Sequence, residues 1–167
     1  MADPFASKIW TWEEVAAHAR AIRESGKKIV FTNGVFDLLH AGHVTYLAEA
    51  AALGDFLIVG LNSDSSVQRL GKSPARPLQN EFSRSRVLAA LTSTGAVVVF
   101  DQDTPAEIIR LTEPDVLVKG ADYAIENIVG ADFVLARGGS VQTIPFIDGY
   151  STTAIEKKIL LAHQPHP

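Results

Sequence analysis

The apolar residues of the chain gather in five short runs that have the length of β-strands. Continuous rather than alternating apolar runs are typical of strands that are buried on both faces of a parallel sheet. Between the runs, apolar residues recur at helical spacing. This alternation predicts one α/β domain with a doubly wound parallel sheet of five strands, in three α/β/α layers. The runs lie near residues 28–33, 56–61, 96–100, 115–118 and 140–144.

Residues 1–26 are expected to form a loose leader and one helix that packs on the outside. Thr11 and Glu14 match the T-x-x-E capping box, and the apolar residues that follow share one helical face until a glycine ends it. The domain proper is predicted over residues 27–162, with residues 163–167 as a tail.

Further helices are predicted from spacing and from capping signals. Thr104, Pro105 and Glu107 have the residue types of N-cap, N1 and N3, which together mark a helix start. The full set comprises helices that begin near Val44, Glu81 and Thr104, a helical turn or two around 126–135, and a closing helix on which Ile155, Ile159 and Ala162 align.

Composition narrows the class of protein. The 167 residues are 47% hydrophobic and 20% charged, which is enough apolar material for a substantial core. The formal net charge of −4 argues against a nucleic-acid partner, and the absence of cysteine excludes disulfides, thiolate metal sites and cysteine nucleophiles. No apolar run approaches the ~20 residues of a membrane span, and no signal-peptide pattern is present. We therefore expect a soluble cytoplasmic protein that has no membrane partner.

Polar clusters follow the apolar runs at the points where strands are expected to end. In a doubly wound parallel sheet, ligands bind beyond the carboxyl ends of the strands, where the strand order switches. The predicted ligand edge therefore carries four clusters: Asn33 to Asp37, Asn62 to Asp64, Val118 to Tyr123 and Gly149 to Thr153.

Two histidines three residues apart, His40 and His43, stand where the first strand gives way to a glycine turn and a helix. The N-terminus of a helix presents free N–H groups and a positive dipole end, which suit an anion such as a phosphate. Imidazolium donors at that place can stabilise charge that builds on a phosphoryl group. Two other interpretations stay open: two solvated histidines, or a zinc pair for which Asp37 is the only nearby third ligand.

The closing helix is preceded by Gly149-Tyr150-Ser151-Thr152-Thr153. One of these hydroxyls could be an ordinary helix cap. Because a cap needs no three consecutive hydroxyls, the stretch is also consistent with a second phosphate-binding helix end.

The basic residues are less diagnostic. Arg69, Lys72 and Arg76 lie in one polar loop, where such residues are usually solvated. Arg86 on its helix is more often a surface charge. Lys119 differs, because it ends a buried apolar strand at the ligand edge of the sheet.

Three common enzyme motifs are missing. No G-x-x-x-x-G-K-[ST] loop, no G-x-G-x-x-G turn after the first strand and no G-x-S-x-G elbow occurs. The chain thus has groups that hold phosphates but no evident nucleophile. That combination favours direct in-line attack by a substrate phosphate on the α-phosphorus of a nucleotide.

These motifs resemble those of a known superfamily. GVFDLLHAGH, residues 34–43, is similar to the signature of the HxGH nucleotidyltransferases, and GYSTT, residues 149–153, to the second motif of their cytidylyltransferase-like branch. Within that branch TNGVFDLLHAGH, GLNSDSSVQRL, ARPLQ, PDVLVKGADY and GYSTT look like the heptose 1-phosphate adenylyltransferases, which make ADP-heptose for lipopolysaccharide. The resemblance covers roughly residues 27 to 160 and implies a Rossmann-like fold.

The resemblance implies a reaction and a set of roles. ATP and D-glycero-β-D-manno-heptose 1-phosphate would give ADP-heptose and pyrophosphate, with Mg²⁺ present and no protein ligand to the metal assigned. A side chain at Gly42 would crowd the phosphates. The catalytic residues would be His40, His43 and Lys72; the nucleotide and its phosphates would be held by Gly34, Val35, Phe36, Gly42, Lys119, Ser151, Thr152 and Thr153; and Asn33, Asp37 and Asp64 would lie near the sugar phosphate or the metal.

The chain departs from its relatives in two ways. Glycerol-phosphate cytidylyltransferases have an arginine within R-T-E-G-I-S-T-T where this chain has Phe146, and Lys119 could take over part of its role. Many members of the heptose family also fuse this domain to a sugar kinase domain, for which a chain of 167 residues has no room. We therefore expect a stand-alone transferase, and a homodimer by analogy. Two alternatives remain: a cytidylyltransferase for glycerol 3-phosphate or an ethanolamine-type phosphate, and a nucleotide-sensing module.

Overall fold

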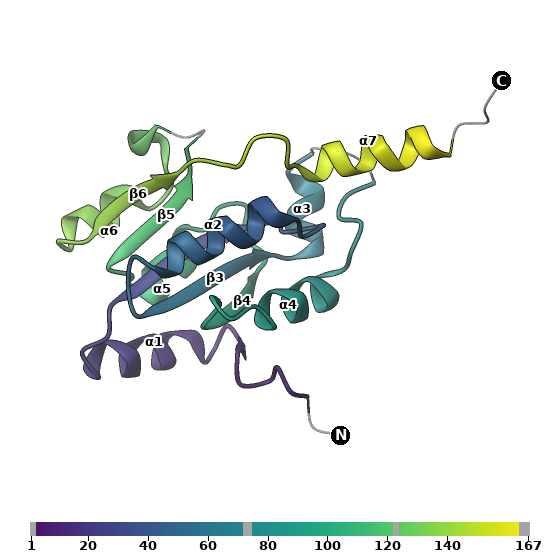
Figure 1. The fold of residues 1–167 in the computed structure, drawn as a ribbon. Coiled ribbons are helices and arrows are strands. Elements are labelled where there is room, and N and C mark those ends of the chain that lie inside the picture. Colours follow the sequence, from purple (N-terminus) through teal and green to yellow (C-terminus); the bar gives the residue numbers. More distant parts are fainter. Residues whose placement is uncertain (1–2, 72–74, 122–123, 164–167) are drawn as a thin grey trace.

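The protein folds around one six-stranded parallel sheet (Figure 1). The computed structural model describes residues 3–71, 75–121 and 124–163. The strands follow the spatial order β1-β4-β3-β2-β5-β6, and every neighbouring pair is parallel. Their bounds are β1 Ile9–Trp10, β2 Ile29–Gly34, β3 Phe56–Asn62, β4 Ala96–Phe100, β5 Val116–Gly120 and β6 Ser140–Ile144.

The predicted parallel α/β sheet is confirmed, but the count of five strands is wrong by one. The additional strand is β1, whose Ile9 and Trp10 pair with Val97 and Val98 of β4. A strand of two residues shows no periodicity, so only its partner reveals it.

The N-terminal residues are more firmly attached than a loose leader would be. Phe5 packs against one of the two apolar clusters, and Lys8 Nζ donates a hydrogen bond to the Leu91 carbonyl oxygen at 3.2 Å. In the helix that follows, α1 Val15–Glu24, both Val15 and Ala19 are fully buried. The described residues before α1 are therefore attached to the sheet and the core, and α1 packs through Val15 and Ala19 on one face of the sheet.

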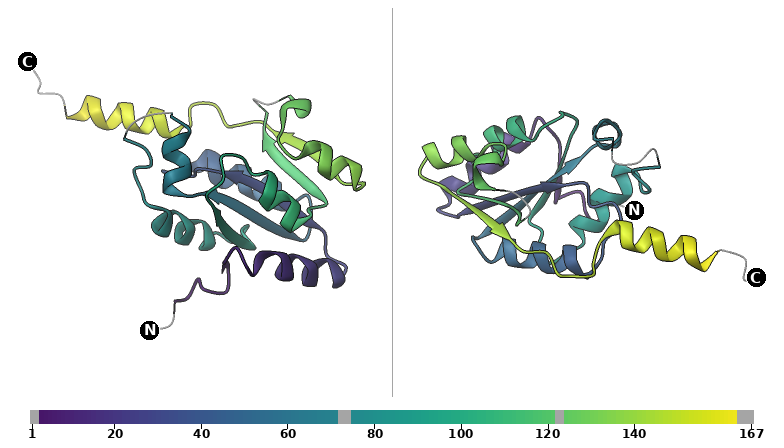
Figure 2. Two further views of the ribbon diagram at one scale, coloured as in Figure 1. Left: turned by 180° about the vertical axis from the view of Figure 1, so that it is seen from behind. Right: turned by 90° about the horizontal axis from the view of Figure 1, so that it is seen from above.

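Helices cover both faces of the sheet (Figure 2). Phe31 and Ile58 pack into one apolar cluster, whereas their neighbours Val30 and Val59 pack into the other, because successive strand residues point to opposite faces. One cluster includes residues of α1, α5 Ala106–Thr112 and α6 Ala131–Ala136, and the other includes residues of α2 Ala41–Ala51 and α4 Glu81–Ala89. Three shorter or outlying elements complete the chain: α3 Asp64–Arg69, the 3₁₀ turn η1 Ile125–Asn127 and α7 Thr152–Ala162.

Two local predictions need correction. Helix α5 has Pro105 rather than Thr104 at the N-cap position, and no side-chain capping bond. Helix α3 stands where the sequence indicated a turn and a polar loop; the Ser63 hydroxyl caps it by accepting from Ser66 N at 3.0 Å. A polar helix of one and a half turns has no apolar stripe by which to recognise it.

Helix α7 lies apart from the two apolar clusters and extends away from the sheet in Figure 1. Its predicted apolar face does not pack into the core: Thr152 is the buried residue of this helix, and Ile159 is 50% exposed. Among the described residues, no helix combines the length and the apolar character that crossing a membrane requires.

The strand order sets the place of the ligand edge. The chain runs outward from β2 through β3 to β4, and then returns across the sheet so that β5 lies on the other side of β2. Connections that leave β2 and β5 therefore diverge, which opens a crevice beyond their carboxyl ends.

Candidate active site

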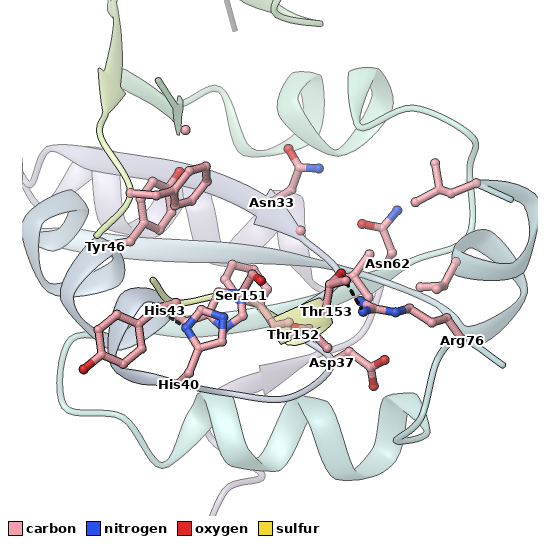
Figure 3. Close-up of a pocket in the computed structure, with 18 of the residues that line it drawn as sticks. Asn33, Asp37, His40, His43, Tyr46, Asn62, Arg76, Ser151, Thr152 and Thr153 are labelled. Atoms are coloured by element: carbon pink, nitrogen blue, oxygen red, sulfur yellow. Dashed lines mark hydrogen bonds between the residues drawn. The ribbon is translucent and has the colours of Figure 1, made fainter. Parts of the chain in front are cut away.

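A cavity of about 760 Å³ lies at this switch point (Figure 3). Its walls come from the carboxyl ends of β2, β3 and β5, from the first turns of α2 and α7, and from the loop that precedes α4. The lining includes most of the predicted site: Asn33, Gly34, Val35, Phe36, Asp37, His40, His43, Lys119, Ser151, Thr152 and Thr153. Tyr46, Asn62, Val67, Leu70, Arg76, Asp103, Pro105, Gly120, Phe146, Tyr150 and Glu156 complete it.

Both predicted motifs are helix N-termini. His40 is the N-cap of α2, and its Nδ1 accepts a hydrogen bond from His43 N at 3.3 Å. Ser151 is the N-cap of α7, and its hydroxyl accepts from Ala154 N at 3.0 Å. Each end presents free N–H groups and a positive dipole end at the cavity, an arrangement that suits an anion.

The two motifs also touch each other. A Cβ atom on Gly42 would lie 3.1 Å from His40 Nδ1 and 3.1 Å from Tyr150 Cβ. Gly42 therefore permits close packing of the first motif on the second, so a side chain there would press on protein groups and not first on the phosphates.

For Gly42→Ala we expect a folded protein whose turnover falls about tenfold, because the methyl group displaces the His40 ring by a few tenths of an ångström. Steady-state kinetics with a thermal melt would separate this loss from unfolding. Glu49→Ala, an exposed change on the same helix, is the control. Full activity in Gly42→Ala would contradict the packing role.

The two imidazoles form one stacked unit. Their ring centroids are 3.8 Å apart, and the Phe36 ring meets His43 edge-on at 5.4 Å. Burial, then the neighbouring charge of His40, lowers the pKa of His43 to about 4, although a backbone hydrogen bond at Leu38 works in the other direction. Burial also lowers the pKa of His40. Both imidazoles are therefore mainly neutral at pH 7 in the free protein, and a bound triphosphate would favour their protonated forms.

The lowered pKa of His43 makes the stability of the free protein depend on pH. Between about pH 6.5 and pH 4, His43 is protonated in the unfolded chain but neutral in the folded protein. The free energy of unfolding therefore decreases as the pH falls through this window. Urea midpoints measured from pH 7 to pH 4.5 should fall less steeply in His43→Asn than in the wild type. Parallel curves would contradict the burial of a neutral His43.

The turn between β2 and α2 is fixed by hydrogen bonds from the α4 segment and the loop before it. Phe36 has φ +46°, a left-handed conformation that costs a non-glycine residue on the order of 1–3 kcal/mol. The Val35 carbonyl accepts from Arg84 Nη1 at 2.7 Å, and the Asp37 carboxylate accepts from Leu78 N at 2.9 Å. These bonds fix the backbone that faces the cavity.

Asp37 has a structural partner rather than a free carboxylate. It is 3% exposed, and its oxygens accept from the backbone N–H groups of Leu78 and Gln79, each at 2.9 Å. Its side chain lines the cavity, and its hydrogen bonds connect the turn after β2 to the loop before α4. The structure thus shows an anchoring role for Asp37, while its place near the sugar phosphate or the metal stays a prediction.

Arg84 supports the turn that lines the cavity, a role that the sequence did not indicate. Its side chain is fully buried, and its guanidinium donates to the Gln79 and Val35 carbonyl oxygens and to Asp64 Oδ1. Asp64, expected near the substrate, is absent from the cavity lining and pairs with Arg84 at 2.7 Å. The sequence does not reveal this burial, because a buried arginine and a solvated one look alike in a helical pattern.

The predicted basic residues are in different surroundings. Lys119 Nζ donates to Asn33 Oδ1 at 2.6 Å, which places both at the junction of β2 and β5. Arg69 is absent from the cavity lining but pairs at 2.7 Å with Asp103, which belongs to the lining. Arg86 pairs with Asp3, and Lys72 lies outside the described residues.

The described residues contain no group of three or more histidine and acidic side chains that could hold a metal ion. The zinc interpretation of the histidine pair therefore finds no third ligand, because Asp37 is already bound to backbone N–H groups.

A Rossmann-like sheet that brings two helix N-termini and a histidine pair to one cavity defines a nucleotide-binding enzyme of the nucleotidyltransferase class. The chain belongs to the cytidylyltransferase-like family, whose family model matches residues 31–158. The family expected from the two motifs is thus confirmed.

Relatives narrow the branch of this family. The chain is 56% identical over 151 residues to the bifunctional protein HldE of Citrifermentans bemidjiense and 58% identical over 134 residues to that of Marinomonas sp.. The alignments cover 90% and 80% of this chain but 31% and 28% of the relatives, so the chain spans about a third of their length.

Two solved structures are similar as well. The lipopolysaccharide core biosynthesis protein from Thermoplasma volcanium has a TM-score of 0.60 at 27% identity, covering 75% of this chain and 100% of that one. Pantothenate synthetase from Thermus thermophilus has a TM-score of 0.58 over 90% of this chain and 70% of that one, at 14% identity, which is a likeness of fold alone.

Proposed function

We propose that this chain is an adenylyltransferase that transfers AMP from ATP to D-glycero-β-D-manno-heptose 1-phosphate, giving ADP-heptose for lipopolysaccharide biosynthesis. The observation that carries the proposal is the cavity at which the α2 and α7 N-termini meet over the stacked pair His40 and His43. The identity to HldE proteins over nine-tenths of the chain supports the choice of sugar.

The proposed chemistry needs no nucleophile from the protein. A phosphate oxygen of the sugar attacks the α-phosphorus of ATP, a P–O bond forms, and the bond from that phosphorus to the bridging oxygen breaks to release pyrophosphate. His40 and His43 donate hydrogen bonds to the phosphoryl oxygens on which charge builds. The free N–H groups and hydroxyls of Ser151, Thr152 and Thr153 hold the β- and γ-phosphates.

Mg²⁺ enters this proposal with the nucleotide. The described residues offer no cluster of carboxylates for a protein-bound ion, and Mg²⁺ commonly binds through substrate phosphates and retained waters. When bound, it neutralises phosphate charge; the chain's own contribution is the two helix ends and the two imidazoles.

Pyrophosphate release tests the proposal. The purified chain would receive ATP or CTP with heptose 1-phosphates of both anomers, glycerol 3-phosphate or phosphoethanolamine. We expect turnover only with ATP and the β-heptose phosphate. Activity confined to CTP would replace the proposal by a cytidylyltransferase, and ATP binding without turnover on any acceptor would favour a nucleotide sensor.

We also propose a cytoplasmic homodimer. Ile159, Leu160 and Leu161 near the end of α7 are 50 to 68% exposed, and an exposed apolar patch of this kind often marks a protein interface. Light scattering of the wild type and of Leu160→Ser with Leu161→Ser would decide it, since a monomeric wild type would contradict the dimer. The proposed substrate ATP supports the cytoplasmic location.

A further inference from the structure

Arg76 lines the cavity, although the loop that carries it has the composition of a solvated segment. Its side chain is 14% exposed. Its Nη2 atom is 2.9 Å from Glu156 Oε2 and donates to Thr153 Oγ1 at 3.4 Å. Figure 3 shows the guanidinium directed toward Thr153, so the loop before α4 and the first turns of α7 meet through this arginine.

Phosphates bound at the N-terminus of α7 would be stabilised by a positively charged side chain nearby. Among the described lining residues, the lysine and arginine side chains are Arg76 and Lys119, and Lys119 is held against Asn33 at the β2–β5 junction. Phe146, which is 51% exposed, occupies the lining just before the second motif. Arg76 is therefore the cation that stands beside the Ser151–Thr153 hydroxyls.

The geometry leaves the guanidinium able to take another partner. Both contacts with α7 use Nη2, and Nε and Nη1 make no hydrogen bond to the described residues. A guanidinium has five N–H donors in a planar fork that fits two phosphate oxygens. Glu156, 27% exposed, holds the fork in place from one side and is itself neutralised by it.

We propose that Arg76 binds the β- and γ-phosphates of the nucleoside triphosphate at the N-terminus of α7, and that Glu156 orients its guanidinium for this contact. The assignment rests on the proposed function, in that the phosphates belong to ATP. It gives the leaving pyrophosphate a cation from a loop that lies outside both signature motifs.

Calorimetry with ATP and with AMP tests the assignment, because AMP lacks the phosphates that Arg76 would bind. For Arg76→Ala we expect ATP affinity to fall roughly 10- to 100-fold, while AMP affinity stays within about twofold of the wild type. Arg76→Lys should recover part of the loss, since it restores the charge without the planar fork. Adding Glu156→Gln to Arg76→Ala should also recover part, because it removes a carboxylate that has lost its partner.

Arg137→Ala is the matched control, since Arg137 also pairs with a glutamate, Glu113 at 2.8 Å, but is absent from the lining of this cavity. It should leave both affinities unchanged. Unchanged ATP affinity in Arg76→Ala would overturn the assignment, and so would an equal loss for ATP and AMP, which would indicate a purely structural ion pair.

Turnover of the wild type with ATP and the β-heptose phosphate, measured beside the calorimetry, separates this inference from the function on which it rests. A wild type that turns over while Arg76→Ala keeps its ATP affinity overturns the inference alone. Selective, Arg76-dependent ATP binding without turnover on any acceptor supports the inference and overturns the proposed function. A wild type that binds neither nucleotide overturns both.

Discussion

Replacing His43 by alanine should lower kcat by roughly 10²- to 10³-fold with only a modest loss of ATP affinity. The His43 ring is fixed before substrate arrives: it stacks on His40 at 3.8 Å and meets the Phe36 edge at 5.4 Å. A donor that is already in place needs no reorganisation as charge builds on the phosphoryl oxygens, so its removal costs the transition state more than the ground state.

Rapid-quench measurement of AMP transfer, with ATP affinity from calorimetry, would separate these two effects. His43→Asn keeps a hydrogen-bond donor and should recover part of the rate. His163→Ala removes an exposed histidine at the far end of α7 and should change neither quantity. Turnover that matches the wild type in His43→Ala, or a loss confined to ATP affinity, would contradict a transition-state role.

Replacing Arg84 by methionine should destabilise the protein by about 3 kcal/mol, the lower part of the range for breaking a buried ion pair. The side chain is 0% exposed and binds two carbonyl oxygens besides Asp64, whose own side chain is 34% exposed. Because Asp64 can be partly rehydrated, the lower figure applies. A melting temperature lower by roughly 6–12 °C would correspond to this loss.

Arg86→Met provides a matched control two residues along the same helix. Arg86 pairs with Asp3 at the surface and stacks on Phe82, so its loss should cost less than about 1 kcal/mol. Urea unfolding of the two variants would measure the difference. An Arg84→Met variant within about 1 kcal/mol of the wild type would refute the view that Arg84 fixes the turn through Val35.

Part of the site could be predicted because its signals are local. The strand that ends at Gly34 and the turn that reaches His43 are read within one short stretch of sequence, and so is the hydroxyl cap at Ser151. A buried parallel strand needs a continuous apolar run, and a helix end needs a cap. Neither depends on what lies elsewhere in the chain.

The remaining site residues have partners that are distant in sequence. Arg84 reaches Val35 across 49 positions, and Arg76 reaches Thr153 across 77. The residues around both arginines are polar, and that pattern is the same whether a guanidinium is solvated or enclosed. Asp37 is similar, since its partners Leu78 and Gln79 offer only their backbone N–H groups, which leave no mark on side-chain pattern.

The sequence alone therefore determined the parallel α/β sheet, the two helix ends that we expect to bind phosphates and the position of the histidine pair, because periodicity, glycine turns and caps are short-range effects. Three features became visible only in the tertiary structure: Gly42 lets the first motif pack on the second, Asp64 forms an ion pair with Arg84, and Arg76 forms an ion pair with Glu156 of α7. Burial and charge pairing arise from contacts across the sheet edge, and no single stretch of the chain contains them.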